Sequence, residues 1–505
     1  MKKKFLLFIN LLALLFAWQV SHIKQVAADD KIKVVTTFYP VYEFTKAVTG
    51  DSADVSMLIK AGTEPHDFEP STKNVATISD ADMFVYMDDS METWVKKVQK
   101  SINSDDLTVV KSTGDMLLMA GTAEEEEEGH EGHSHEYDPH VWLSPKRAVT
   151  LVENIRDAFV AKYPDKAETF KTNSAAYIEK LNDLDKKYSD ALSNAKQKSF
   201  VTQHAAFGYL ALDYGLNQIP ITGVSAESEP SAKRLASLTK YVKKYDIKYI
   251  YFEENASSKV AATLADEAGV KTAVLNPLES LTTKEIKAGE DYFTVMKDNL
   301  KALRLTTDVK GKEIKAETDD TKTVQHGYFK DKDVTDRKLT DWSGTWQSVY
   351  PYLLDGTLDE VWEYKADASK GEETAQEVKD YYTTGYKTDV EKIIIDGKKN
   401  TVTFVQNGEE HKYIYKYVGY KILKYEKGNR GVRYLFEAKD DNAGDFKYIQ
   451  FSDHNISSTK AEHFHLFWGS TSQKAILKEM DNWPTYFPAS KSGQEIAQDL
   501  VAHLD

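Results

Sequence analysis

The sequence predicts a two-lobed α/β domain with a long connecting helix, followed by a mostly antiparallel β-barrel domain. The chain has 505 residues, too many for one compact core. Between Ile32 and Arg304 short apolar runs alternate with helical periods, a pattern typical of parallel sheets covered by helices. Beyond residue 325 short runs rich in aromatic and β-branched residues follow one another between tight turns, as in a small antiparallel barrel.

Short apolar runs mark the strands of the first lobe. Ile32 to Phe38 is the first, and Met83 to Met87 is continuously apolar, as a buried parallel strand should be. Val55 to Ile59 is a further expected strand, and a helix from Val41 to Val48 follows the Tyr39-Pro40 turn. Strands separated by helices in this way predict a parallel sheet.

The connecting helix is predicted from a run without Gly or Pro, Lys166 to about Lys196. Within it Leu181, Leu184 and Tyr188 keep an i, i+3, i+7 apolar stripe among many charges. At roughly 1.5 Å per residue such a helix approaches about 45 Å. That length suits a helix that joins two lobes.

Strand–helix alternation resumes after the long run and predicts a second lobe, with a cleft between the two. The expected strands are Phe200 to Thr202, Ile219 to Val224, Tyr249 to Phe252 and Thr272 to Leu275, and the expected helices are Ala232 to Lys244 and Lys259 to Ala268.

Residues 305 to 325 predict a hydrophilic linker, because Thr, Asp, Lys and Glu dominate and apolar residues nearly vanish. Asp-Gly, Asn-Gly and Lys-Gly turn signals separate the strand-like runs that follow. A helical run from Glu495 closes the chain. The expected strands are Trp346 to Tyr350, Ile393 to Ile395, Thr401 to Val405, Tyr413 to Val418, Tyr434 to Phe436 and Phe446 to Phe451.

The first 28 residues predict an export signal. A basic segment, Lys2 to Lys4, precedes the apolar run Phe5 to Ala17, which is too short to span a bilayer comfortably. Val26-Ala27-Ala28 offers small residues for cleavage before Asp29. We therefore expect an exported chain, with an uncleaved membrane anchor as the alternative.

Composition limits the chemistry. A net charge of −15 argues against a nucleic-acid partner. The chain has no cysteine, which excludes disulfides, thiolate metal sites, cysteine nucleophiles and iron–sulfur clusters. Any metal must therefore be held by His, Asp or Glu.

Residues 121 to 137 are expected to form an acidic, histidine-rich surface loop. The stretch from Glu124 to His140 holds four histidines and a run of carboxylates, with no aliphatic residue that could join a core. Imidazole and carboxylate are ligands that zinc prefers. The alternative is a solvated acidic run with incidental histidines.

Three histidines of the first domain lie in loops or at expected strand ends. His66 lies in a proline-bounded loop, His140 lies between the acidic stretch and a helix start, and His204 follows a strand. Ligands gather at the carboxyl ends of strands in open α/β sheets, so the three could converge, with Glu279 just past the last strand as a fourth ligand. Three nitrogens and a carboxylate would give zinc a closed tetrahedral shell. Taken alone, each histidine is more often a structural residue than a ligand.

A tighter cluster lies in the second domain. His463 and His465 flank Phe464, so on a strand both imidazoles project to one face. His454 could approach from the preceding strand end or loop. Three histidines on a barrel rim can hold zinc and leave a position for water. A polar face with coincidental histidines is the alternative.

Six motifs of the first domain form a specific set: Phe38 to Pro40, Glu64 to Pro70, Asp138 to Leu143, Gln203 to Phe207, Glu229 to Ser231 and Leu275 to Glu279. Through them residues Ile32 to Leu303 resemble the cluster A-I metal-binding proteins of ABC importers, which are zinc and manganese receptors. The resemblance implies two lobes joined by a rigid helix, with the metal between them and His66, His140, His204 and Glu279 as ligands. Manganese receptors of that family usually place Glu where His204 stands, which favours zinc.

Residues 326 to 505 resemble the ZinT zinc-binding domain, a lipocalin-like barrel. The match implies that His454, His463 and His465 are its ligands. Three further histidines match no ligand position and are expected on the surface: His326, His411 and His503. The matching segments are Trp342 to Pro351, Lys427 to Arg433, the three ligand histidines, and Met480 to Tyr486.

Together the resemblances predict the domain order: signal peptide 1–28, metal-binding receptor domain 29–304 with the loop 121–137, linker 305–325, and ZinT-like domain 326–505. They imply an extracellular zinc receptor that delivers Zn²⁺ to the permease of an ABC importer, with the ZinT-like domain as a second capture site. We expect a monomer that is not an enzyme and binds no nucleic acid. A zinc-dependent hydrolase and a surface adhesin are the alternatives.

Localisation is expected to depart from the family in one respect. Those receptors are usually lipoproteins, tethered through a cysteine after the apolar signal segment. Here Leu15-Phe16-Ala17 is followed by Trp18. Without a lipid-bearing cysteine, a secreted or signal-anchored form is expected at the cell surface.

Overall fold

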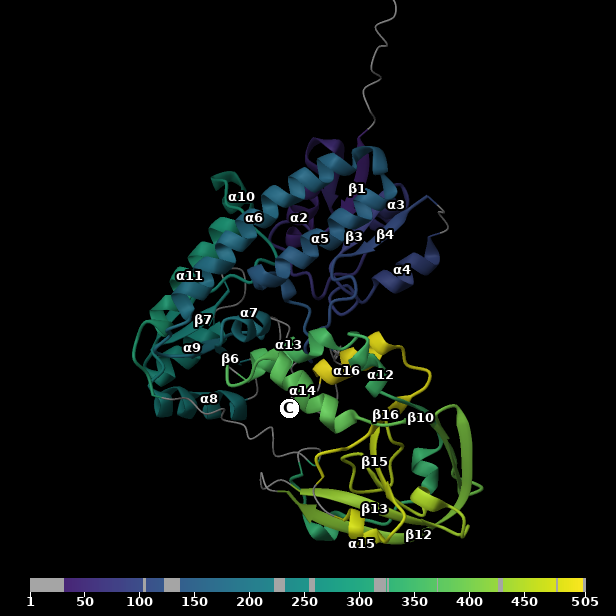
Figure 1. The fold of residues 1–505 in the computed structure, drawn as a ribbon. Coiled ribbons are helices and arrows are strands. Elements are labelled where there is room, and N and C mark those ends of the chain that lie inside the picture. Colours follow the sequence, from purple (N-terminus) through teal and green to yellow (C-terminus); the bar gives the residue numbers. More distant parts are fainter. Residues whose placement is uncertain are drawn as a thin grey trace, which may run out of the picture.

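The computed structural model describes residues 31–102, 106–121, 137–221, 232–253, 259–312, 324, 327–369, 371–425, 430–477 and 480–502. They form two α/β lobes and a β-barrel, with a layer of helices between the lobes and the barrel (Figure 1). The fold class expected from the sequence is therefore confirmed. The expected export signal and residues 122–136 of the acidic loop lie outside the described residues. None of the helices in the described ranges is long and apolar enough to cross a membrane.

The first lobe is a four-stranded parallel sheet in the order β2-β1-β3-β4. Strand β3 is buried along its whole length, as its continuous apolar run predicted. The elements are β1 (Ile32–Thr36), α2 (Tyr39–Thr49), β2 (Ala53–Met57), α3 (Thr72–Ser79), β3 (Met83–Tyr86), α4 (Val95–Ser101) and β4 (Thr108–Lys111).

The second lobe repeats this architecture with the parallel order β6-β5-β7-β8. Helix α10 begins with a capping box in which Thr282 and Glu285 satisfy each other's backbone N–H groups. The elements are β5 (Ser199–Thr202), α7 (Gly208–Asp213), β6 (Asn217–Pro220), α8 (Ala232–Tyr245), β7 (Tyr249–Phe252), α9 (Lys259–Ala268), β8 (Lys271–Val274), α10 (Thr283–Ala288) and α11 (Tyr292–Thr307).

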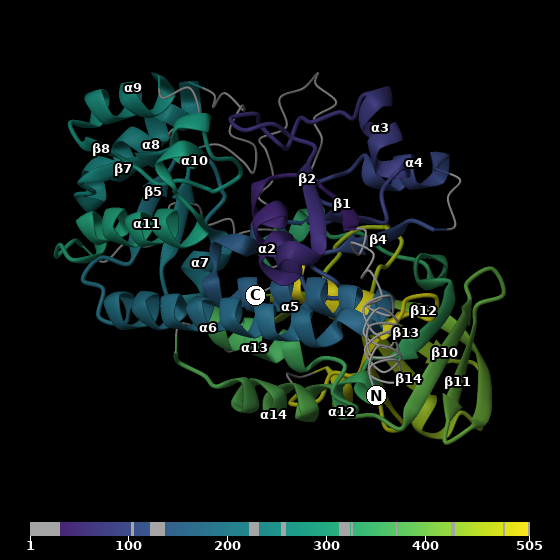
Figure 2. The ribbon, with the colours of Figure 1, turned by 90° about the horizontal axis from the view of Figure 1, so that it is seen from above.

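Two consecutive helices join the lobes, α5 (Pro145–Lys162) and α6 (Ala167–Leu192). The 26 residues of α6 span about 39 Å. Helix α6 packs on α5 and α2 of the first lobe and on α11 of the second lobe. Figure 2 shows α6 running along both lobes. The hydroxyl of Tyr188 donates to the carbonyl of Met296, 2.6 Å away, and ties α6 to α11. The predicted connecting helix is present, four residues shorter at its end than expected.

The C-terminal domain is a closed antiparallel barrel in the order β10-β11-β12-β13-β14-β15-β16-β9. Trp342, Tyr434 and Phe451 lie at the centre of its aromatic core. The strands are β9 (Gly344–Ser348), β10 (Val390–Asp396), β11 (Thr401–Gln406), β12 (Glu409–Lys424), β13 (Arg430–Ala438), β14 (Tyr448–Ser452), β15 (Phe464–Gly469) and β16 (Thr485–Pro488).

Helices between the barrel and the lobes were not predicted from the sequence, apart from the last. Their buried residues, which include Trp362, Tyr364 and Ile496, belong to the same apolar core as the receptor lobes. The helical layer therefore shares a core with the receptor lobes, whereas the barrel keeps a separate core of its own. These helices are α12 (Tyr350–Leu354), α13 (Asp359–Ala368), α14 (Ala375–Tyr386) and α16 (Gly493–Ala502); the short α15 (Gln473–Ile476) lies against the barrel.

Candidate metal centres

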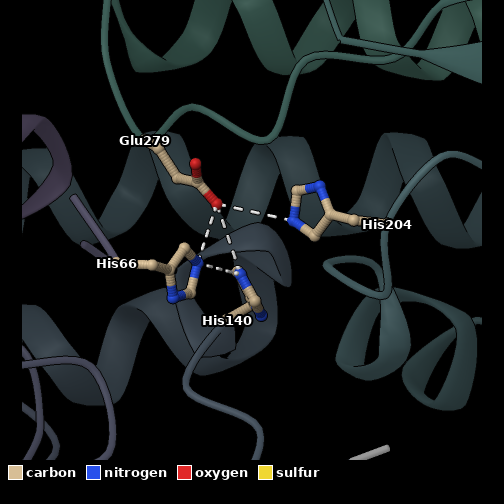
Figure 3. A group of neighbouring side chains, drawn as sticks. All are labelled: His66, His140, His204 and Glu279. Atoms are coloured by element: carbon tan, nitrogen blue, oxygen red, sulfur yellow. Dashed lines mark hydrogen bonds and ion pairs between the residues drawn. The ribbon is translucent and has the colours of Figure 1, made fainter. Parts of the chain in front are cut away.

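Four side chains converge between the two lobes: His66, His140, His204 and Glu279 (Figure 3). Each lies in a segment that follows the carboxyl end of a parallel strand, after β2, β4, β5 and β8 respectively. One potential ligand atom of each lies within 4.8 Å of the other three. The structure thus brings together the residues that the sequence placed in separate loops.

The spacing of these atoms fits one tetrahedral ion. Glu279 Oε1 lies 3.3 Å from the Nε2 atoms of both His66 and His140. It lies 3.5 Å from His204 Nε2, and the Nε2 atoms of His66 and His140 are 3.1 Å apart. Donors bound to zinc at about 2.0–2.1 Å in a tetrahedron are roughly 3.3–3.4 Å from one another. The side chains outline such a shell with little rearrangement.

The cluster is shielded from solvent. The side chains of His66, His140 and His204 are at most 1 % exposed, and that of Glu279 is 5 % exposed. His204 Nε2 is buried and has no close hydrogen-bond partner among the described residues, since Glu279 Oε1 lies 3.5 Å away. A buried polar atom left in that state costs about 1–3 kcal/mol. Coordination to a cation would satisfy it, so the donor set fits a metal.

Two carboxylates outside the cluster orient the imidazoles. His140 Nδ1 donates to Asp138 Oδ1 at 2.7 Å, and His204 Nδ1 donates to the carboxylate of Glu253. These bonds leave each Nε2 as the atom that faces the centre. Neither carboxylate was predicted from the sequence. Two features of the sequence could have pointed to them: Asp138 stands two residues before His140, and Glu253 directly follows the end of β7.

The metal-free centre carries an ionised carboxylate and one held proton. Burial opposes charge on His140, but the carboxylates of Asp138 and Glu279 outweigh it and raise the pKa of His140 to about 9. Burial also opposes charge on Glu279, yet its interactions with His140, His204 and His66 keep its pKa well below its usual value. Burial lowers the pKa of His204. A divalent cation can therefore displace the proton of His140 and meet an anionic Glu279.

A third carboxyl group borders the cluster. Glu64 Oε1 accepts a hydrogen bond from the backbone N–H of His66 at 3.0 Å and so fixes the loop that carries this histidine. Burial, followed by repulsion from Glu279, raises the pKa of Glu64 to about 8. At neutral pH Glu64 is thus largely uncharged, and Glu279 supplies the negative charge of the centre.

A second group forms on the outside of the barrel: His454, His463 and His465, with one nitrogen of each within 4.8 Å of the others. His454 Nε2 lies 3.3 Å from His465 Nε2. Phe464, between the other two histidines, is fully buried in the barrel core, so the flanking imidazoles point away from it. The alternation predicted from the sequence is present.

Side-chain contacts hold two of these imidazoles. His465 Nδ1 bonds the hydroxyl of Thr485 at 2.8 Å, across the β15–β16 pair. The ring of His463 stacks on Phe487, with the ring centres 5.2 Å apart and the planes at 22°. Burial first, and then the neighbouring His454 and His463, lower the pKa of His465 well below its usual value. This histidine is neutral at physiological pH, the state that binds metal.

A buried arginine fixes the turn that carries His454. Arg337 pairs with Asp453 at 2.5 Å and with Asp341 at 3.1 Å. His454 itself has φ of +62°, in the left-handed region that residues other than glycine rarely occupy. Such a conformation persists only where the surroundings impose it, and the Arg337–Asp453 pair lies directly beside it.

The remaining histidines join neither group among the described residues. His411 lies half-buried in β12, with its ring centre 5.9 Å from that of Phe446. His326 and His503 lie outside the described residues.

Comparison with known proteins matches each domain to a family. The model of the ZnuA family, described as the zinc-uptake complex component A, matches residues 34–305. The model of the ZinT family, described as a lipocalin-like zinc-recruitment domain, matches residues 320–503. The zinc-binding protein AdcA of Streptococcus pyogenes serotype M1 is 66% identical over 515 residues, which cover all of both chains. The chain belongs to the AdcA family. The family expected from the sequence motifs is thereby confirmed.

Other AdcA proteins agree along the whole chain. The zinc-binding lipoprotein AdcA of Streptococcus pneumoniae strain R6 is 62% identical over 507 residues, again all of both chains. The crystal structure of Zn(II)-bound AdcA from that species has a TM-score of 0.83, with 62% identity, and covers 94% of this chain and 100% of that one. The match therefore extends to the arrangement of the two domains.

The localisation expected from the missing cysteine is wrong. Two AdcA proteins of Streptococcus pneumoniae, 62% identical over their full length, are named lipoproteins, which implies lipid-tethered proteins of the cell surface. A secreted or signal-anchored form was expected because Trp18 stands at the position of the lipid-bearing cysteine. Trp18 lies outside the described residues, so the expectation rested on one sequence position alone. The extracellular surface itself agrees with the AdcA relatives.

Proposed function

We propose that the chain is an extracellular receptor that binds Zn²⁺ between its two lobes and delivers it to the permease of an ABC importer. His66, His140, His204 and Glu279 hold the transported ion. The observation that carries this proposal is the buried set of four donors at tetrahedral spacing. Membership of the AdcA family supports the same function.

The donor set favours zinc over harder cations. Three imidazoles and one carboxylate suit a borderline divalent ion, whereas Ca²⁺ takes 6–8 oxygen ligands and Mg²⁺ keeps several waters. His204 supplies a nitrogen where a manganese site would gain from another oxygen.

The ZinT-like domain is a second capture site, with His454, His463 and His465 as its ligands. Its three-nitrogen set leaves one position for water or for an incoming ligand, which suits exchange. The predicted linker, residues 305–325, joins this site to the receptor lobes, although its first three residues belong to α11 instead. Keeping both sites on one chain raises the local supply of zinc. The acidic stretch before Tyr137 acts as a weak collector rather than as part of either site.

Metal stoichiometry of the full mature chain tests the two ligand sets. The unaltered chain should bind two ions, one for each cluster, and His204→Ala and His463→Ala should each lose one. The remaining ion should report the untouched site, because the two clusters share no residue. Zinc counts by elemental analysis after dialysis measure this. Retention of both ions in both variants would contradict the proposal.

Deleting residues 124–136 tests the role of the acidic stretch. We expect tight zinc binding to persist, because none of the seven ligands lies within the deletion. Uptake by cells should slow only when zinc is scarce. Loss of tight binding in a chelator competition would show that the ligands are assigned wrongly.

We further propose that the receptor is a monomer with no enzymatic activity and no nucleic-acid partner. A hydrolase would have to use the open position of the three-histidine group to activate water. Among the described residues that group contains no carboxylate that could serve as a base at ligand distance. Ester or peptide hydrolysis that is lost in His463→Ala would favour the hydrolase.

Matrix binding that persists without metal would favour a second role as an adhesin.

A further inference from the structure

The backbone from Leu117 to Met119 lies between the two domains. It follows β4 and leads to Ala120, which forms an isolated antiparallel bridge with Tyr137. Leu117 and Leu118 are buried, at 1 % and 4 % exposure. Side chains of the C-terminal domain bind this segment on one side, and the turn that carries His140 binds it on the other.

The contacts from the C-terminal domain come from α13 and α16. Tyr364 donates its hydroxyl to the carbonyl of Leu117, and Glu360 accepts from the N–H of Leu117 at 3.2 Å. Gln498 bonds both backbone groups of Leu118, accepting from its N–H at 2.8 Å and donating to its carbonyl at 2.6 Å. The domain thus satisfies four consecutive backbone groups of the receptor. Figure 1 shows α13 and α16 directly beneath the lobes.

The contacts toward the zinc centre start at the next residue. The N–H of Met119 donates to the hydroxyl of Tyr209 at 2.8 Å, and this hydroxyl donates to the carbonyl of Asp138 at 2.7 Å. The carbonyl of Met119 accepts from the N–H of Asp138 at 2.9 Å. Asp138 Oδ1 then accepts from both the backbone N–H and Nδ1 of His140, at 2.9 and 2.7 Å.

A buried arginine joins the two ends of this path. Arg147 stacks on the rings of Tyr209 and Tyr364, 5.0 and 4.3 Å from their centres. It also donates to the hydroxyl of Tyr364 and forms a bidentate pair with Asp213, at 2.9 and 2.7 Å. Its planar guanidinium fits this combination of stacking and forked bonding. Tyr364 is therefore held in place from the receptor side as well.

The space around Asp138 leaves little freedom at the end of the path. A methyl group at Gly208, the first residue of α7, would lie 2.9 Å from Asp138 Oδ2. The glycine lets α7 approach the carboxylate closely. A displacement of the 117–119 segment must therefore move Asp138, because α7 blocks any compensating shift of its side chain.

From this continuous set of contacts we propose that Tyr364 of the C-terminal domain is a positioning residue for the receptor's zinc centre. It acts on His140 through Leu117 to Met119, Tyr209 and Asp138. The inference rests on the proposed function in taking His140 as a zinc ligand. It gives the C-terminal domain a role beyond metal capture: it sets the geometry of the transport site.

The test compares Tyr364→Phe with Tyr352→Phe in the full chain. Both remove one tyrosine hydroxyl, but the hydroxyl of Tyr352 donates to Gln347 of its own domain, at 3.0 Å. All variants carry His463→Ala, so that zinc release is read from one site. We expect Tyr364→Phe to release zinc about three- to tenfold faster into a chelator, as loss of one buried hydrogen bond predicts. Tyr352→Phe should release it at the parent rate.

A second measurement separates positioning from a general loss of stability. In the zinc-free chain with labelled histidines, the Nδ1–H resonance of His140 reports its bond to Asp138. It should shift in Tyr364→Phe and in Tyr209→Phe, which breaks the next link, and stay in place in Tyr352→Phe. If the resonance shifts in Tyr209→Phe but not in Tyr364→Phe, the influence on His140 originates within the receptor lobes, and the proposal is overturned. Equal release rates and resonances in Tyr364→Phe and Tyr352→Phe would overturn it as well.

One further variant keeps this inference apart from the proposed function. His140→Ala in the same background should lose the remaining ion. If it keeps the ion, the assigned ligand set is wrong. If it loses the ion while Tyr364→Phe matches its control, only the positioning role of Tyr364 is wrong.

Discussion

The two metal centres differ in almost every physical respect. The centre between the lobes has four donors, all nearly inaccessible to water, and carboxylates orient two of its imidazoles. The centre on the barrel has three donors and an exposed His454, and a hydroxyl and an aromatic ring support its other imidazoles. Electrostatic attraction is stronger where water is excluded. The first centre is thus suited to retaining an ion, and the second to exchanging one.

The protonation states sharpen the contrast. In the metal-free receptor Asp138 and Glu279 hold a proton on His140, whose pKa is raised to about 9 against the effect of burial. In the barrel, burial and the neighbouring histidines leave His465 neutral, with its pKa well below the usual value. An ion entering the first centre must displace a proton, whereas an ion entering the second need not take one from His465.

Removing the shared carboxylate should have the largest effect. Glu279→Gln keeps the shape of the side chain but removes the charge that faces three imidazoles. We expect zinc affinity of the first centre to fall by more than about a hundredfold, since loss of a mere orienting partner already costs about 10–100-fold. Competition with a chelator measures this. An equal loss at the barrel centre would show that the two are not independent.

Removing an orienting partner should have a smaller effect, and a different one in each centre. Asp138→Asn replaces the carboxylate that accepts from His140 Nδ1, and we expect a loss of about 10–100-fold in affinity. Thr485→Val removes the neutral hydroxyl that contacts His465 Nδ1, and we expect a loss of only about two- to tenfold. The same titration compares the two variants. Equal losses of zinc affinity would show that the charged partner of His140 and the neutral partner of His465 contribute alike.

The pH dependence of zinc affinity should be specific to the first centre. Zinc must displace one proton from His140, so the zinc affinity of the first centre should rise about tenfold per pH unit between pH 7 and 8. His465 is already neutral in this range, so it should not make the affinity of the barrel centre depend on pH. Calorimetry in buffers of different ionisation enthalpy counts the released protons. Release of fewer than half a proton per ion by the first centre would contradict the assigned state of His140.

The same proton sets the stability of the metal-free receptor. Because the pKa of His140 is higher in the folded chain than the usual 6.5, its contribution is fully present below about pH 6.5 and is lost as pH rises toward 9. The melting temperature of the metal-free chain should therefore fall over that range. In His140→Gln this part of the fall should disappear.

The four proposed ligands of the first centre could be grouped from the sequence only through the family motifs that carry them. Each lies in a segment that follows a parallel strand, which made their convergence possible but did not establish it. His66, His140, His204 and Glu279 follow β2, β4, β5 and β8, and parallel strands bring such positions to one edge. Glu253 also follows a strand, but a single acidic residue there is too common to single out. The link from Tyr364 to Asp138 could not be predicted, because no local pattern states which helix of one domain packs on which segment of the other.

The barrel was predictable from its alternation and turns, whereas the helices before β10 were not. In α13 and α14 half of the buried positions are aromatic, namely Trp362, Tyr364 and Tyr386. Aromatic residues are also favoured in strands, so over short stretches the two types of element look alike. Their place between the domains depends on packing with the receptor lobes, which is tertiary information.

Helix α6 has a consequence for how the permease can recognise a loaded receptor. The helix packs on α2 and α5 of one lobe and α11 of the other, so the lobes cannot swing apart without breaking its backbone hydrogen bonds or this packing. A wide jaw-like closure around the ion is therefore unavailable. Entry and recognition must instead depend on small displacements of the loops that carry His66 and Glu279. The zinc-bound receptor would then differ from the zinc-free one in the local shape of its surface where the lobes meet, and not in its overall shape.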